Sequence, residues 1–262
     1  MELGLDGKIA AISGASEGLG RAVARRLSAE GAKVAICARR VDVLERTAQE
    51  IRDETGGEVL AIPADMTSAE ETEQFIRQTA DHFGGLDILM NNAGTHAANP
   101  FDEIDDALWA YDFDQKFFSA VRCTRLAIPL MRERGGGRII NITHVTAKAP
   151  LPRSLPTVAS RAAAMAMTKA LSREYAADNI LVNTVCLGAV KTAQWERRRL
   201  LEAPDVAADD WYGRLAEARG IPLGRLGDAD EAADLIAFLV SERAGYITGT
   251  AVNFDGGSSW TL

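Results

Sequence analysis

Short apolar runs alternate with longer amphipathic segments through about the first hundred residues of the chain. The apolar runs are typical of buried parallel strands. The longer segments, whose apolar residues recur every three or four positions, are typical of helices. Regular alternation of the two predicts an α/β fold with a doubly wound parallel sheet. The strands expected here span 9–12 (IAAI), 33–38 (KVAICA), 59–63 (VLAIP) and 86–90 (LDILM).

Two of the helices between these strands carry recognisable ends. The segment 41–55 is followed by Gly56, a residue that favours the left-handed conformation at a helix end. Ser68 is a candidate N-cap for a helix that runs through Phe83. Glu71, three residues after Ser68, would complete a capping box.

The second half of the chain continues the alternation with longer elements. Residues 105–131 predict one long helix, and glycines at 135–137 separate it from a strand at 137–143. A helix at 157–177 and a strand at 180–185 follow a proline-punctuated loop. The alanines at 159, 163, 166 and 170 of that helix form a ridge of small residues, which serves either core packing or a subunit interface.

Composition restricts the class of protein. The 262 residues suit one large α/β domain or two small ones, and 47% hydrophobic content supports a substantial core. A net charge of −8 argues against a nucleic-acid or anionic-membrane surface. No apolar run approaches the ~20 residues that span a bilayer, and the first residues lack the pattern of a signal peptide. The three cysteines show no metal-like or redox spacing, so we expect a cytoplasmic protein without a metal site.

The first strand leads directly into a glycine-rich turn. Lys8–Gly20 (KIAAISGASEGLG) combines an apolar run, glycines at 14, 18 and 20, and the start of a helical pattern. Glycines let the backbone approach a pyrophosphate, whose charge is stabilised by the unpaired N–H groups and dipole of a helix N-terminus. This context favours a dinucleotide site over an ordinary tight turn.

The end of the second strand bears on the choice of dinucleotide. An acidic residue there binds the ribose hydroxyls of NAD, whereas a basic one accommodates the 2′-phosphate of NADP. Arg39 and Arg40 occupy this point, which favours NADP(H) and leaves NAD(H) possible. The alternative is that the two arginines begin a solvated helix and bind no phosphate. Glu17 in the glycine turn also weighs against NADP(H), because its charge would repel a phosphate.

Several motifs in the same order resemble the short-chain dehydrogenase/reductase family. They are SGASEGLG at the glycine turn, NNAG at 91–94, GRIINIT at 137–143, ILVNTV at 180–185 and the closing segment from IPLGRLG to NFDGG. The resemblance implies one Rossmann-type domain over residues 1–262 with seven strands flanked by helices. It also implies a nicotinamide cofactor, a small-molecule substrate and a homotetramer or homodimer. The cofactor-binding positions it implies are Gly14, Ser16, Gly18, Leu19, Gly20, Arg39, Asp65, Met66, Asn92, Ala93, Gly94, Arg161, Gly188 and Thr192.

Carried over to this chain, the family's catalytic positions hold unexpected residues. Family members use a tyrosine, a lysine four residues later, a serine thirteen residues before the tyrosine, and an asparagine in the preceding long helix. Here these positions fall on Thr157, Arg161, His144 and Lys116, respectively. None of the four expected residue types is present, so the chain is interpreted as an atypical member of the family.

These replacements change the available chemistry. Thr157 can donate a hydrogen bond but is a poor general acid, and Arg161 stays charged and can hold a cofactor ribose or a substrate oxygen. His144 either takes over the acid/base role or is a hydrogen-bonded neutral histidine at a strand end. Lys116, Arg161 and Arg153 would form a cationic cluster, which predicts an anionic substrate group such as a carboxylate or enolate. The alternative is that Lys116 points elsewhere and Arg153 is solvated.

Residues 193–220 lack a clear pattern and correspond to the family's substrate lid; an amphipathic surface helix pair is the alternative. Three functions stay open at this point. The first is an NADP(H)-preferring oxidoreductase acting on a carbonyl or alcohol with an altered active site. The second is a non-catalytic dinucleotide-binding homologue, and the third is a non-redox enzyme that reuses the cleft.

Overall fold

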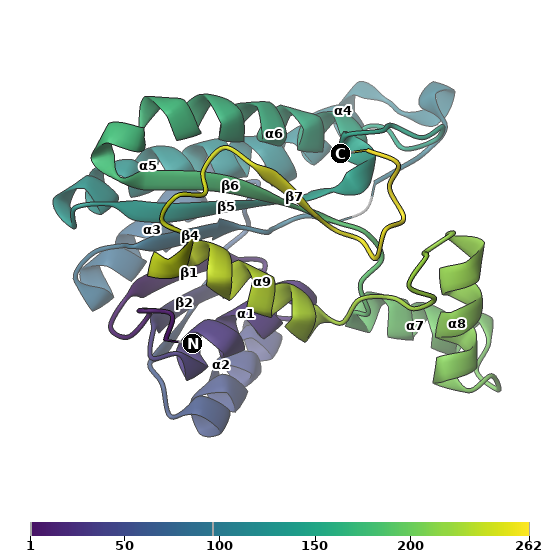
Figure 1. Cartoon of the computed structure of the whole chain (residues 1–262), viewed down its shortest axis with the longest axis horizontal. Coiled ribbons are helices and arrows are strands. Elements are labelled where there is room, and N and C mark those ends of the chain that lie inside the picture. The colour runs from purple at the N-terminus through teal and green to yellow at the C-terminus, as the bar shows by residue number, and fades with distance from the viewer. Residues whose placement is uncertain (1, 96, 262) are drawn as a thin grey trace.

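Seven parallel strands form one sheet in the order β3-β2-β1-β4-β5-β6-β7 (Figure 1). The computed structural model describes residues 2–95 and 97–261, without the side chains of residues 193 and 194. The doubly wound parallel sheet predicted from the sequence is confirmed, with the fourth strand beginning two residues later than expected. The strands are β1 Ile9–Ser13, β2 Lys33–Ala38, β3 Val59–Pro63, β4 Ile88–Asn91, β5 Gly137–His144, β6 Ile180–Leu187 and β7 Ala251–Phe254.

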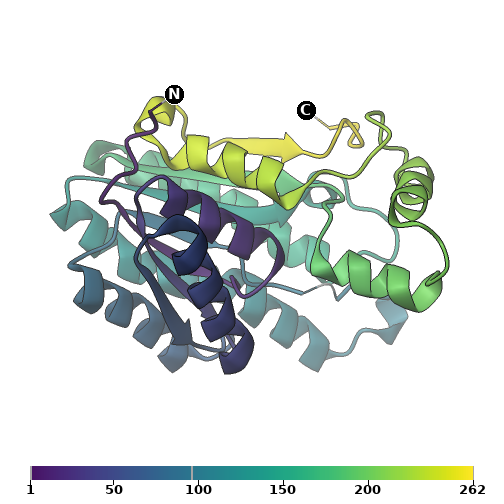
Figure 2. The same ribbon diagram turned by 90° about the horizontal axis from the view of Figure 1, so that it is seen from below.

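Helices cover both faces of the sheet (Figures 1 and 2). One layer contains α1, α2 and α9, and the other contains α3, α5 and α6, while α7 and α8 project beyond the end of the sheet. The helices are α1 Gly18–Ala29, α2 Val41–Thr55, α3 Ala69–Phe83, α4 Asp106–Phe113, α5 Ser119–Glu133, α6 Thr157–Glu174, α7 Ala193–Glu202, α8 Ala208–Ala218 and α9 Ala229–Val240. Short 3₁₀ turns span Phe101–Glu103, Val145–Ala147, Ala176–Asp178 and Glu242–Ala244.

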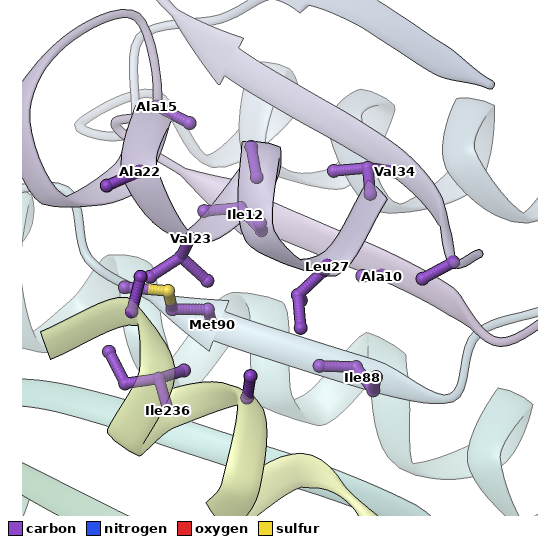
Figure 3. Packing of buried hydrophobic residues seen from close by; sticks show 14 of the residues in the cluster. Ala10, Ile12, Ala15, Ala22, Val23, Leu27, Val34, Ile88, Met90 and Ile236 are labelled. Carbon is purple, nitrogen blue, oxygen red and sulfur yellow. The ribbon is translucent and has the colours of Figure 1, made fainter. Parts of the chain in front are cut away.

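Alternation along the strands divides the core between the two layers. Ala10 and Ile12 of β1 pack with α1 and α9, as Figure 3 shows around Val23 and Ile236. The intervening residue Ala11 faces the opposite way and packs with α3 and α5. Because both faces of each strand are buried, the strands appear in the sequence as continuous apolar runs.

The long helix predicted for residues 105–131 contains an irregular turn. Asp114–Phe118, labelled η2, is a π-helical turn between α4 and α5. Such a turn adds a residue to the helical repeat and re-aims the side chains that it carries. Gln115 and Lys116 on this turn are both buried, although both are polar. The turn therefore directs two polar side chains inward from an otherwise amphipathic helix.

One finer prediction about helices is wrong, and one of the two alternatives for another is excluded. Ser68 Oγ accepts a hydrogen bond from the Glu71 N–H, but the Glu71 carboxylate accepts one from Asp65 N instead of completing a capping box. The alanine ridge of α6 does not pack in the core, because Ala166 and Ala170 are exposed. The inward face of α6 carries other residues of the helix, among them Ala164 and Thr168.

The segment 193–220 forms the helix pair α7 and α8, which matches the surface-pair alternative in its secondary structure. A small apolar cluster that includes Ala216, Ile221 and Leu226 lies at the base of this pair. Within residues 2–95 and 97–261, no helix combines the length and apolar character needed to cross a membrane.

A row of buried polar side chains crosses the centre of the sheet. Asn141 of β5 lies opposite Asn91 of β4, whose Nδ2 donates to Asn141 Oδ1 at 2.8 Å. Asn141 Nδ2 in turn donates to Thr168 Oγ1 of α6 at 2.8 Å, and Thr168 Oγ1 lies 2.8 Å from Thr184 Oγ1 of β6. Because a buried polar group is costly without a partner, this row fixes α6 against the sheet.

We expect Asn141→Leu to destabilise the protein by about 2–4 kcal/mol, since Asn91 and Thr168 each lose a buried partner. Ile139→Val, on the same face of β5, is the matched control and should cost only about 0.5–1.5 kcal/mol. Urea unfolding followed by circular dichroism measures both changes. Equal losses in the two variants would contradict the role given to the polar row.

Candidate cofactor cleft and active site

The turn between β1 and α1 requires glycine at two of its positions. Gly14 has φ +66°, and a Cβ there would lie 2.9 Å from Ala93 Cα. A Cβ at Gly20 would lie 2.5 Å from the Gly14 carbonyl oxygen. Both distances are shorter than a van der Waals contact, so these residues let the turn close tightly against the end of β4.

Side chains at the ends of β1 and β4 hold this turn in place. Asn92 Nδ2 donates to the carbonyl oxygens of Ser13 and Gly14, both at 2.9 Å. Ser13 Oγ accepts from the backbone N–H groups of Asn92 and Ala93, both at 3.0 Å. The Asn92 amide is thus hydrogen-bonded to the turn itself. Ser13, which sequence reasoning did not single out, helps to position the same turn.

A cleft of about 620 Å³ lies at the carboxyl ends of the strands. Most of the predicted cofactor positions line it, and Gly20, Arg161 and Gly188 do not. Gly20 lies behind the turn, and Gly188 packs on Asp255, whose Cβ would be 2.7 Å from a Cβ at Gly188. The predicted residues that line the cleft are Gly14, Ser16, Gly18, Leu19, Arg39, Asp65, Met66, Asn92, Ala93, Gly94 and Thr192.

Charged side chains gather where β2 reaches the cleft. Arg39 Nη1 donates to Tyr111 Oη at 3.4 Å, a weak contact. Glu17 accepts from Arg40 Nη2 at 2.8 Å and from Arg197 Nη1 of α7 at 3.3 Å. The two arginines offset the charge of Glu17, which sequence reasoning expected to repel a phosphate. Because Arg40 and Arg197 are exposed and the Glu17 side chain is 34% exposed, each pair contributes at most about 1 kcal/mol.

Lys116 and Arg161 lie together beside Gly94, which lines the cleft. A Cβ at Gly94 would be 3.1 Å from Lys116 Cγ and 3.7 Å from Arg161 Nη2, so both side chains press against this backbone. Arg161 Nη1 donates to the Ile142 carbonyl oxygen of β5 at 3.1 Å. Its Nε is buried without a hydrogen-bond partner among the described residues. Burial lowers the pKa of Arg161, and Asp112 partly opposes this.

Thr157 at the start of α6 completes this cluster with the buried Asp112 of α4. Lys116 Nζ donates to Asp112 Oδ1 and, at 3.0 Å, to Thr157 Oγ1. Asp112 Oδ2 accepts from Ser160 Oγ at 2.6 Å. Burial lowers the pKa of Lys116, Asp112 partly opposes this and Arg161 adds to it, and together they bring the pKa to about 8. The tertiary structure therefore brings three of the four candidate catalytic residues into one cluster.

The premise that these cations lack a counter-anion is wrong. Asp112 is 1% exposed and bonds directly to Lys116, so the cluster already contains a carboxylate. Arg153 is exposed in the loop before α6. Asp112 therefore balances the charge of Lys116, and Arg161 is the cation of the cluster that bonds to a backbone carbonyl oxygen rather than to a carboxylate.

His144 lies at the end of β5, opposite Leu187 in the β5–β6 register and so beside Gly188. Its Nδ1 accepts a hydrogen bond from the Thr146 backbone N–H at 3.2 Å and lies 2.8 Å from Thr146 Oγ1. Since a backbone N–H can only donate, the ring proton of the neutral form resides on Nε2. This arrangement matches the hydrogen-bonded histidine alternative and makes His144 a hydrogen-bond donor through Nε2.

Sequence reasoning missed Asp112, Gln115 and Ser160. Gln115 lines the cleft, and its Oε1 accepts from the Thr95 N–H and Oγ1, both at 3.0 Å. One signal for Asp112 was present, because it lies four residues before Lys116 on a predicted helix, the spacing of a side-chain ion pair. Among the described residues, no cluster of histidine, cysteine and acidic side chains could hold a metal ion.

Comparison with known proteins gives one consistent relationship. Residues 14–259 match the model of the enoyl-(acyl carrier protein) reductase family. The chain is 33% identical over 255 residues to a 3-oxoacyl-acyl-carrier-protein reductase of Vibrio cholerae, covering 97% of this chain and 98% of the relative.

Two similar solved structures contain NADPH. The L-sorbose reductase of Gluconobacter frateurii, complexed with NADPH and L-sorbose, has a TM-score of 0.95, 34% identity and complete (100%) coverage of both chains. A short-chain oxidoreductase of Pseudomonas aeruginosa that contains an atypical catalytic centre, in its NADPH-bound form, has a TM-score of 0.91 and 31% identity, covering 98% of this chain and 99% of that one.

We expect Asn92→Ala to weaken binding of NADPH, the dinucleotide held by these two relatives, by about 10-fold, or ~1.4 kcal/mol. The reason is that the glycine turn loses two hydrogen bonds that set its shape. Titration followed by NADPH fluorescence measures the change. Gln74→Ala removes an exposed amide from α3 and should leave affinity unchanged; equal affinity in both variants would remove the role given to Asn92.

Proposed function

The chain belongs to the short-chain dehydrogenase/reductase family, and we propose that it is an NADP(H)-dependent oxidoreductase acting on a carbonyl or alcohol group at an altered active site. One observation carries this proposal. Gly94 lines the cleft closed by the glycine turn, and the side chains of Lys116 and Arg161 lie against that residue. A dinucleotide site and a polar cluster suited to a substrate oxygen are therefore continuous.

The preference for NADP(H) is supported by the charges at the end of β2. Arg39 lines the cleft there, and within residues 2–95 and 97–261 it forms no ion pair with a carboxylate. Glu17 is neutralised by Arg40 and Arg197. A 2′-phosphate therefore meets an arginine rather than an uncompensated carboxylate. The NADPH-bound relatives agree with this preference.

The residues present fit a nicotinamide cofactor. Gly14 and Gly20 let the turn close tightly at the edge of the cleft, because a Cβ at either position would collide with the chain, and the buried Nε of Arg161 lacks a partner among the described residues. Bound NADPH would supply the hydride for the carbonyl carbon. The turn would hold the pyrophosphate, Arg161 would bind the nicotinamide ribose, and His144 Nε2–H would donate a hydrogen bond to the substrate oxygen.

The altered site also supports a second candidate, a non-catalytic dinucleotide-binding homologue. Thr157 Oγ1 accepts hydrogen bonds from Lys116 and from the Ala97 N–H, so its hydroxyl is already engaged. The relative with an atypical catalytic centre supports departures from the usual residues within the family. A non-redox enzyme that reuses the cleft has no observation of its own in its favour.

We further propose a small-molecule substrate, a cytoplasmic location and a homodimer or homotetramer. The exposed alanines of α6 would permit close approach of a second copy, and light scattering measures the number of copies directly.

Arg39→Ala should weaken NADPH binding by about 10-fold and change NADH binding by less than about threefold, because only NADPH carries the 2′-phosphate. Fluorescence titration with each dinucleotide measures the ratio. Arg77→Ala, at an exposed arginine of α3, should alter neither affinity. A similar loss for both dinucleotides would argue against recognition of the phosphate by Arg39.

The activity itself is tested by loss of NADPH absorbance with L-sorbose, ethyl acetoacetate and phenylglyoxylate, which are a ketose, a β-keto ester and an anionic α-keto acid. We expect turnover of at least one, with kcat about 100-fold lower in His144→Ala and NADPH affinity unchanged. His82→Ala, at an exposed histidine of α3, is the matched control. Binding of NADPH without turnover of any of the three would favour the non-catalytic homologue.

A further inference from the structure

The hydroxyl of Thr157 can act only as a donor toward any further partner. Its oxygen accepts from Lys116 Nζ at 3.0 Å and from the Ala97 backbone N–H at 3.1 Å. These two bonds use the acceptor capacity of a hydroxyl oxygen. The proton of Thr157 points to Asp112 Oδ1 across a long contact of 3.3 Å. A substrate oxygen could therefore replace this weakest of its three contacts.

Lys116 is held behind Thr157 in a defined position. Its side chain is 3% exposed, and its Nζ is shared between Asp112 and Thr157. Asp112 is fixed in turn, because Ser160 Oγ donates to its other oxygen at 2.6 Å. Charged groups that face Lys116 among the described residues are Asp112 from α4 and Arg161 from α6. Lys116 also packs against Gly94, a residue that lines the cleft, so the cation bonded to the Thr157 hydroxyl lies next to the cleft.

We propose that Lys116 is the proton source for carbonyl reduction and that the Thr157 hydroxyl carries the proton from Nζ to the substrate oxygen. This inference rests on the proposed function and concerns the same site. A bound nicotinamide would supply the hydride to the carbonyl carbon, and the carbonyl oxygen would take the proton of Thr157 Oγ1. Thr157 Oγ1 takes a proton from Lys116 Nζ at the same time, which leaves a neutral amine beside Asp112.

The relay resolves a difficulty with Thr157 at the tyrosine position. An isolated alcohol is far too weak an acid to protonate an alkoxide efficiently near neutral pH. A hydroxyl that receives a proton as it gives one never carries the full negative charge, so its own acidity no longer limits the step. The acidity that matters is then that of Lys116, which burial has brought to a pKa of about 8. Asp112 is a positioning residue that keeps Nζ on Thr157.

The sign of the pH dependence follows from the protonation state that the relay needs. Reduction requires the protonated amine, so kcat should fall as pH rises through about 8. Alcohol oxidation requires the neutral amine and should rise over the same interval. Lys116→Arg keeps the positive charge beside Asp112 but removes a group that titrates near neutrality.

The test compares wild type, Lys116→Arg and Lys116→Met with the three carbonyl probes named above. We expect kcat to fall at least about 100-fold in both variants, and we expect the change of kcat near pH 8 to disappear from their pH profiles. KM and NADPH affinity should stay within about threefold of wild type. Lys169→Met, at an exposed lysine of α6, should retain the wild-type profile. Lys116→Met leaves Asp112 buried without its partner and could fail to fold for that reason. The double variant Asp112→Asn, Lys116→Met removes both buried charges, so it should fold and still be inactive.

A second measurement needs neither cofactor nor substrate. Nuclear magnetic resonance of ¹³Cε-labelled lysines should show one resonance, absent in Lys116→Arg, that titrates near pH 8, well below the ~10.4 of a lysine in a model peptide. A Lys116 resonance that does not titrate near pH 8 would overturn the inference alone. A Lys116→Arg variant with the kcat and pH profile of wild type would also overturn the inference, and the proposed function would stand. Wild type that binds NADPH but turns over none of the probes would overturn both.

Discussion

The hydrogen bonds from the Asn92 amide to the glycine turn are the constraint on which the candidate site depends. They join the end of β4 to the end of β1, two strands that are adjacent in the sheet but about eighty residues apart in sequence. With this link in place, the chain after Asn92 runs past the turn as the wall of the cleft. Gly94 on that wall then meets Lys116 and Arg161. One amide therefore sets the relation between the two ends of the site.

The second constraint is the buried ion pair of Asp112 and Lys116. Removing one member of such a pair typically costs ~3–5 kcal/mol, whereas a matched apolar pair is often equally stable. Stability therefore does not explain why both charges are retained in the interior. A proton-transfer role for Lys116 does explain it, because Asp112 and Ser160 together hold Nζ on the Thr157 hydroxyl. The π-helical turn at Asp114–Phe118 serves the same arrangement by directing Lys116 inward.

The two halves of the site differ in how many of their residues the sequence predicts. At the cofactor end, glycine spacing and strand ends are local features, and the residues predicted from them mostly line one cleft. At the catalytic end, single positions such as Thr157 and His144 could be identified only through the family resemblance. Their partners were not foreseen: Asp112 pairs with Lys116 in the cluster that was expected to need an anionic ligand, and Thr146 engages Nδ1 of His144.

By itself, the sequence determined the order of strands and helices, the parallel sheet and the glycine turn, because each depends on residues that are close together in the chain. Only the tertiary structure decided which polar groups meet. Lys116 and Thr157 are separated by 41 residues, and the charge pair, the relay contact and the outward face of the alanine ridge all depend on how α4, η2 and α6 pack together. Contacts of this kind arise from packing between elements, for which periodicity within one element carries no information.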